Sequence, residues 1–85
     1  MFFKIKSIEI LPNFIIRANF ENNVIKTYDF KPLFEKYPVF EPLKQKSFFN
    51  QAVVDCGGYG IKWNDDIDID AAEIWHNGTI DLKTE

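Results

Sequence analysis

The sequence predicts an α+β fold: a small antiparallel sheet, made of a three-stranded meander and a second hairpin, covered on one face by one or two short helices. Three observations predict it. Apolar residues alternate with polar ones through the first third, change to near-helical spacing among prolines in the middle, and return to short alternating runs around a glycine-rich turn. With 85 residues, we expect a single domain over residues 1–85.

The first third predicts three antiparallel strands. Apolar side chains recur at mostly every second position through residues 2–10, and a slip near Ser7 indicates a bulge or bend. Residues 14–20 alternate cleanly, so one face of that strand carries Phe14, Ile16, Ala18 and Phe20. A hairpin loop containing Asn23, a residue type that tolerates positive φ, leads into a third strand over residues 24–28.

The middle of the chain predicts two short helices. Pro32 is tolerated in the first turn of a helix over residues 32–37, and Pro38 ends that helix. Apolar residues then recur at near-helical spacing over residues 41–51, with Pro42 at the expected start. We expect this second helix to cover the apolar face of the sheet.

The last third predicts a second hairpin followed by a helical turn. Residues 52–56 and 59–63 have strand patterns on either side of two glycines. Asp70 and Glu73 have the spacing of a capping box, in which each side chain bonds the backbone amide of the other residue. Gly78 is expected to end the helical turn with left-handed backbone angles.

Composition and charge narrow the function classes. Aromatic residues make up 16% of the chain and supply a core without metal or disulfide, while a single cysteine and a charged N-terminal segment favour the cytoplasm over secretion or a membrane. The net charge of −3 divides into +3 over residues 1–54 and −6 over residues 55–85. With a pI near 5.1, the chain is not expected to bind nucleic acid directly.

The acidic segment 64–70 is the candidate for metal or small-ligand binding, the alternative function. Its candidate metal ligands are Asp66, Asp68 and Asp70, whose alternation imitates the start of a calcium-binding EF loop. The required glycine and final glutamate are replaced by Ala71 and Asn77. We therefore expect a strand with buried isoleucines between exposed carboxylates, and no cofactor.

Cys56 and His76 are the candidates for nucleophilic chemistry. A hydrolytic pair would need them in contact, oriented by a carboxylate such as Asp55, Asp68 or Glu73. The pattern instead places Cys56 in a strand as a small apolar residue and His76 at a helix end. We expect no catalytic residues and no enzymatic activity.

The amino-acid composition favours protein interaction as the function. The aromatic residues exceed what one thin sheet-and-helix core can bury, and a two-layer domain leaves one sheet face open. The interface candidates on that open face are Phe3, Ile15 and Trp63. The expected partner is either a second copy of the chain, through sheet faces or an edge strand, or a small protein.

Several segments together resemble a known family. They are Phe20-Glu21-Asn22-Asn23-Val24, Tyr28-Asp29-Phe30 and, most distinctively, Trp63-Asn64-Asp65-Asp66-Ile67-Asp68-Ile69. Over residues 3 to 78 the chain resembles the bacterial domain of unknown function 2442. The resemblance implies a short bacterial α+β protein without established catalytic residues. It also implies an antitoxin-like role as partner of a second small protein encoded beside it.

Overall fold

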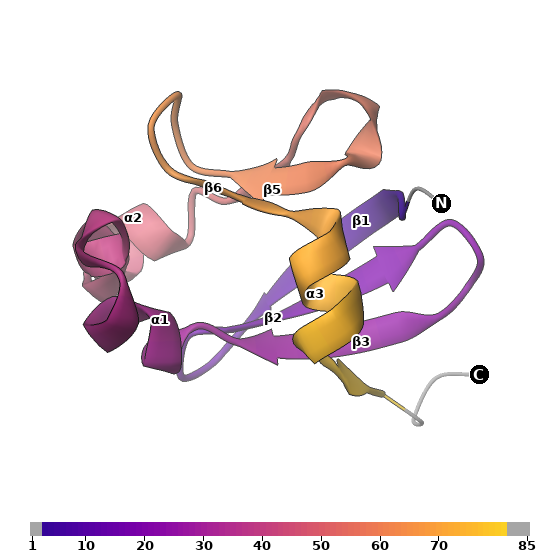
Figure 1. Ribbon diagram of the computed structural model, residues 1–85, viewed down its shortest axis with the longest axis horizontal. Coiled ribbons are helices and arrows are strands. Elements are labelled where there is room, and N and C mark those ends of the chain that lie inside the picture. Colours follow the sequence, from indigo (N-terminus) through magenta and orange to yellow (C-terminus); the bar gives the residue numbers. More distant parts are fainter. Residues whose placement is uncertain (1–2, 82–85) are drawn as a thin grey trace.

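Two antiparallel sheets organise the computed structural model, which describes residues 3–81 (Figure 1). The first sheet has the strand order β1-β2-β3-β7, with β1 (Ile5–Leu11), β2 (Ile15–Phe20), β3 (Ile25–Asp29) and β7 (Thr79–Ile80). The second has the order β4-β5-β6, with β4 (Val53–Val54), β5 (Gly60–Lys62) and β6 (Asp68–Asp70). Together with the short helices, these sheets confirm the predicted α+β fold.

The meander follows the alternation of the sequence. β1 pairs with β2 and β2 with β3, both antiparallel, and the register shifts between Ile5 and Ser7, where the bulge was predicted. Ile16, Ala18 and Phe20 on β2 are almost completely buried, as the predicted face requires. Asn23 has a φ of 69° in the hairpin turn, which confirms its left-handed conformation.

Helical segments connect or cover the strands, and the four longest lie in the middle of the chain and near its end. They are α1 (Lys31–Lys36), the 3₁₀ helix η1 (Pro38–Lys44), α2 (Lys46–Phe49) and α3 (Ala71–Asn77). The prediction of one helix over residues 41–51 is wrong, because Pro42 lies inside η1 and Gln45 adopts an extended conformation that separates η1 from α2. The apolar positions are nevertheless buried: Leu43 and Phe49 both belong to the core.

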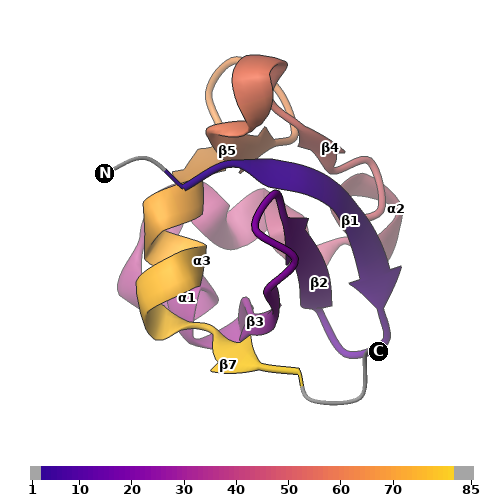
Figure 2. The same cartoon turned by 90° about the vertical axis from the view of Figure 1, so that its right-hand side faces the viewer.

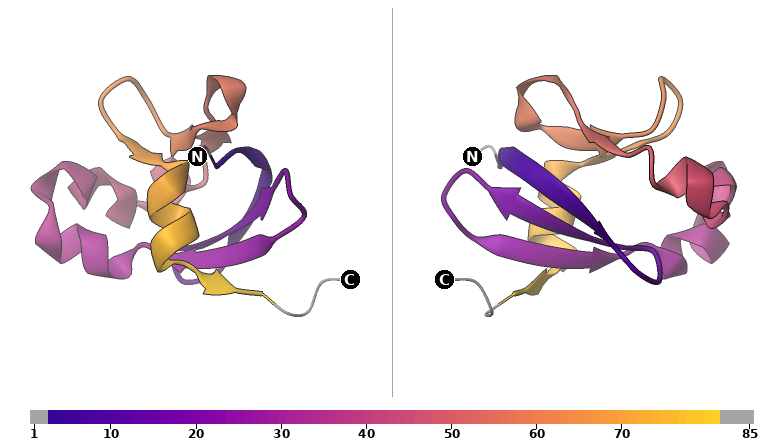
Figure 3. Two further views of the ribbon diagram at one scale, coloured as in Figure 1. Left: turned by 45° about the vertical axis from the view of Figure 1, so that its right-hand side comes forward. Right: turned by 180° about the vertical axis from the view of Figure 1, so that it is seen from behind.

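The core lies between the two sheets rather than under helices alone. Figure 2 shows β4 and β5 above the curved β1 strand, with α3 along another side of the interior. Figure 3 shows α1 and α2 at one end of the meander. The predicted helical layer on one sheet face is therefore incomplete, because the second sheet covers the same side of the meander.

An aromatic cluster joins β3, α2 and β5. The ring of Phe30, directly after β3, packs edge-on against Phe49 and Trp63, with centroids 5.5 Å apart in both pairs. The indole Nε1 of Trp63 donates a hydrogen bond of 2.9 Å to the carbonyl of Phe49. This bond satisfies the polar atom of a buried ring and fixes α2 against the second sheet.

The two ends of helix α3 are not capped as predicted. Asp70 occupies the N-cap position, but its side chain makes no capping hydrogen bond, so the capping box is not formed. Gly78 follows the helix with a φ of −80°, so the predicted left-handed ending is also wrong. Glycine is needed there because a Cβ would lie 2.5 Å from the Ile74 carbonyl oxygen and 3.0 Å from that of Thr27. That close approach leads the chain into β7, which the sequence did not predict.

We expect the substitution Gly78→Ala to lower the free energy of unfolding by about 2–3 kcal/mol, because its methyl group would meet backbone oxygens that cannot move independently. Gly57→Ala is the matched control. Its φ is +83°, but its Cβ would meet only the ring of the exposed Tyr59, so the expected loss is about 1 kcal/mol. Urea unfolding of both variants checks this; equal losses would contradict the close approach as the reason for Gly78.

Candidate functional site

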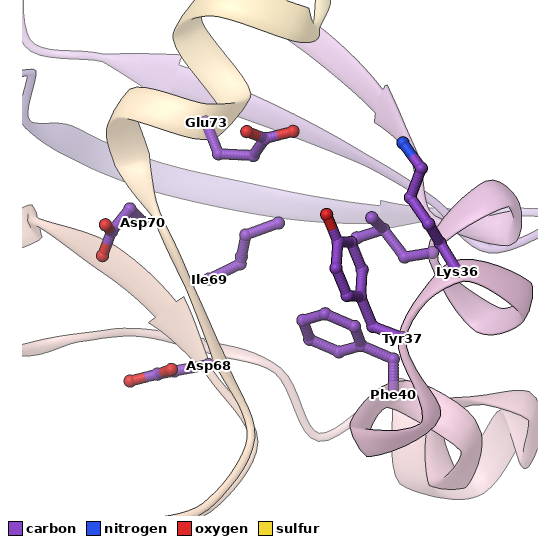
Figure 4. Close-up of a pocket in the computed structure, with 8 residues that line it drawn as sticks. Lys36, Tyr37, Phe40, Asp68, Ile69, Asp70 and Glu73 are labelled. Atoms are coloured by element: carbon purple, nitrogen blue, oxygen red, sulfur yellow. The ribbon is translucent and has the colours of Figure 1, made fainter.

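A groove of about 320 Å³ separates the α1–η1 segment from β6 and the start of α3 (Figure 4). Its volume lies at the small end of the range for ligand pockets, roughly 300–1,000 Å³. The residues that line it are Leu33, Lys36, Tyr37, Phe40, Asp68, Ile69, Asp70 and Glu73. One wall is thus helical and mainly apolar, and the other is an acidic strand.

The helical wall ends in an exposed apolar surface. Tyr37 adopts an extended conformation between α1 and η1, and its carbonyl accepts from the amide of Phe40 at 3.0 Å. The two rings pack edge-on, with centroids 6.2 Å apart. Tyr37, in the groove lining, is 48% exposed, and Val39, which precedes the lining residue Phe40 in the chain, is 52% exposed. We call Tyr37, Val39 and Phe40 the groove mouth.

The opposite wall is β6, the edge strand of the second sheet. The Ile67 carbonyl accepts from the Trp63 amide at 2.9 Å, and the Ala71 amide donates to the Tyr59 carbonyl at 2.8 Å. Between these bonds Ile69 pairs with Ile61. In an antiparallel ladder, every second residue bonds the neighbouring strand, and the residues between them direct their N–H and C=O groups away from that strand. The backbone groups of Asp68 and Asp70 therefore face the groove.

Glu73 connects α3 to the first sheet instead of capping its own helix. Its carboxylate accepts hydrogen bonds from the Tyr28 hydroxyl at 2.8 Å and from the Asn77 amide at 2.9 Å. Burial raises the pKa of Tyr28, and the hydrogen bond to Glu73 raises it further. The phenol therefore stays protonated and acts as a donor rather than as a base.

The acidic segment does not bring its carboxylates together. Asp68 and Asp70 are exposed on the side of β6 opposite the buried Ile69, as the alternation predicted. Asp66 lies in the preceding turn, where its amide donates to the Asn64 side-chain oxygen. Within residues 3–81, no group of three or more His, Cys, Asp or Glu side chains could hold a metal ion.

Cys56 and His76 have separate surroundings. Cys56 is exposed in the 3₁₀ turn η2 (Cys56–Gly58), so its predicted place in a strand is wrong; β4 ends at Val54 because Asp55 caps that turn through the Cys56 amide. The imidazole of His76 packs edge-on against Phe3, with centroids 5.3 Å apart. The geometry gives no reason to pair the two residues in one site.

The three predicted interface residues do not share a surface. The expected exposure of Trp63 is wrong, because the ring is 7% exposed and belongs to the core. Phe3 is half-buried and stacks on Trp75 at a centroid distance of 4.8 Å. Ile15 is half-buried beside its cross-strand neighbour Leu11. Whether Phe3 or Ile15 contributes to an interface stays a prediction.

The groove mouth was missed at the sequence level. The signal that could have found it is the run Tyr37-Pro38-Val39-Phe40, four consecutive side chains with large apolar surface at a position where one helix ends and another begins. A connection between helices lies at the surface, so at least part of such a run is exposed there.

Comparison with known proteins gives one match. The family model described as "Protein of unknown function (DUF2442)" matches residues 5–79, which is most of the 85-residue chain. No curated protein and no solved structure matches the chain. None of the helices within residues 3–81 is both long enough and apolar enough to cross a membrane.

We expect Tyr28→Phe to lower the free energy of unfolding by about 1–2 kcal/mol at pH 7, because the Glu73 carboxylate loses a part-buried donor. The raised pKa makes this contribution depend on pH. It is complete below about pH 10, where tyrosine is protonated in the unfolded chain too, and it falls as the pH rises above that value. Urea unfolding from pH 7 to 11 checks this. A difference between wild type and variant that does not shrink above pH 10 would count against the described environment of Tyr28.

Proposed function

The chain belongs to the family of proteins of unknown function DUF2442, and on this basis we propose that it is a non-catalytic protein-interaction module. The observation that carries the proposal is the groove mouth. Tyr37 is about half exposed in the lining of a groove to which the buried Leu33 and Ile69 also belong, and Val39, two residues further along the chain, is exposed to a similar degree. Clustered apolar side chains at the rim of a depression are typical of protein-binding surfaces.

The chemistry of the groove lining supports the non-catalytic part of the proposal. Among the lining residues that the structure describes, none is serine, threonine, cysteine or histidine. Glu73 is already engaged by Tyr28 and Asn77. The lining therefore offers apolar contact, the side chain of Lys36 and the acidic strand β6, which suits recognition better than nucleophilic or acid–base chemistry.

The partner that we propose is a small basic protein encoded beside this one, as an antitoxin-like role in the cytoplasm implies. Residues 55–85 carry a net charge of −6, and this segment includes Asp68 and Asp70, whose carboxylates lie on the outer side of the strand that borders the groove. Exposed acidic side chains beside an interaction surface speed association with a basic partner and disfavour acidic competitors. The charge thus selects the partner, while the groove mouth supplies the apolar contact.

A homo-oligomer is the second form of partnership that the sequence favours, and the outer face of the first sheet is its candidate surface. Ile15 lies there beside Leu11. The same face carries Arg17, whose guanidinium is bonded to Glu9 and Asp81. Because this charged group would have to be covered, we give the groove precedence as the interaction surface.

We expect Tyr37→Ser to weaken the complex with the product of the adjacent reading frame at least about tenfold, because interface energy concentrates in aromatic side chains. Tyr59→Ser is the matched control, since Tyr59 is equally exposed (50%) on a different surface, and it should leave affinity unchanged. Co-expression followed by light scattering and calorimetry measures both. Absence of a complex at micromolar concentration, or equal loss in the two variants, would remove the proposed function.

A further inference from the structure

The edge of β6 offers backbone hydrogen-bonding groups to the groove. The register leaves the amide and carbonyl of Asp68 and the amide of Asp70 on the side away from β5. The Asp70 carbonyl is not counted with these groups, because Asp70 is the N-cap of α3 and an N-cap carbonyl accepts the first hydrogen bond within its helix. Within residues 3–81, no hydrogen bond from another segment reaches the three outward groups. An edge of this kind is a template for an additional strand.

The two faces of β6 differ in chemistry. The side chain of Ile69 points to the interior, toward the wall that carries Tyr37 and Phe40 (Figure 4). The carboxylates of Asp68 and Asp70 lie on the outer side. Because side chains of paired strands meet on the same face, a strand added here would place one set of side chains over the apolar wall and the other beside the carboxylates.

The carboxylate of Asp70 has no side-chain neighbour across β5, because the opposite residue is Gly60. Asp68 is opposite Lys62, but no ion pair joins these two within the described residues. Asp70 is also not used as a helix cap. An arriving basic side chain would therefore meet at least one carboxylate that the fold itself leaves unpaired.

A second copy of this chain does not fit the same edge. Two β6 strands paired antiparallel about Ile69 would place each Asp68 opposite the Asp70 of the other copy. Like charges directly opposite in a sheet are destabilising. The charge pattern thus favours a basic segment from a different protein over self-association at this edge.

We infer that β6 takes up an extended segment of a partner protein as an additional antiparallel strand, and that this segment alternates basic and apolar residues. The inference rests on the proposed function and specifies its partner. The basic side chains meet Asp68 and Asp70, and the apolar ones enter the groove over Tyr37 and Phe40. The edge is only three residues long, so the segment alone binds weakly, with a Kd on the order of 100 µM.

A synthetic seven-residue peptide that alternates lysine and valine, capped at both ends, is the probe. In ¹H–¹⁵N titrations of the full chain we expect the amides of Asp68 and Asp70 to shift most. The double variant Asp68→Asn, Asp70→Asn should bind about fivefold more weakly. The double variant Asp65→Asn, Asp66→Asn removes the same charge from the neighbouring turn and is the matched control, with affinity reduced less than twofold.

Two further peptides test the mode of binding. A version with N-methyl groups on its lysine backbone amides, the set that faces the edge when the lysines stand opposite Asp68 and Asp70, cannot donate to the edge and should not bind. An alternating glutamate and valine peptide should not bind either. Binding of either one as tightly as the parent, or shifts centred on β4, overturns the inference. If the peptide does not bind but the partner protein still forms a complex that depends on Tyr37, strand addition alone is overturned. Peptide binding without a complex overturns the proposed function alone.

Discussion

The contact between Trp63 and Phe49 is the constraint on which the rest of the structure depends. Helix α2 has four residues and α1 has six, too few for stability in isolation. The chain from Phe30 to Phe49 is instead held at both ends, because both rings insert into the cluster around Trp63 and the Trp63 indole bonds the Phe49 carbonyl. The groove mouth lies between Phe30 and Phe49, so both ends of this irregular segment are held in place by the core.

Glu73 shows how a tertiary contact overrides a local one. A capping bond to the start of α3 would satisfy one exposed amide, whereas the bond from Tyr28 satisfies a hydroxyl at a part-buried position. An unsatisfied buried polar group costs more than an exposed one, which water can solvate. The side chain therefore turns toward β3. Asp70 is left without its reciprocal partner, and the edge strand keeps a carboxylate free for other contacts.

A structural feature can be predicted from the sequence when the interactions that cause it are local in the chain. The bulge near Ser7, the turn at Asn23 and the buried face of β2 follow from short-range alternation and backbone preference, and the structure confirms them. The same holds for the exposed Asp68 and Asp70 around a buried Ile69. β7 and the burial of Trp63 depend on which segments meet in space, and period-two patterns carry no information on that.

The candidate site follows the same division. The acidic strand wall could be predicted because alternation of aspartate and isoleucine indicates a half-buried edge. The groove mouth was not predicted, because its residues fall at the end of the helix expected over residues 32–37 or in the gap before the one expected over residues 41–51, whereas the structure places Val39 and Phe40 in the 3₁₀ helix η1. Interrupted helices present their side chains in directions that a single helical period does not describe.

The two tryptophans occupy unlike environments. Trp63 is enclosed by Phe30 and Phe49, whereas Trp75 is half-buried near the surface, stacked on Phe3, with the Lys26 ammonium 4.6 Å from its ring centroid. Their fluorescence therefore reports on two places at once. Contact with solvent both shifts indole emission to the red and admits iodide as a quencher, and the enclosed indole of Trp63 has less of that contact in the folded chain. Emission that iodide does not quench therefore comes chiefly from Trp63, and it lasts as long as the core around that ring stays closed.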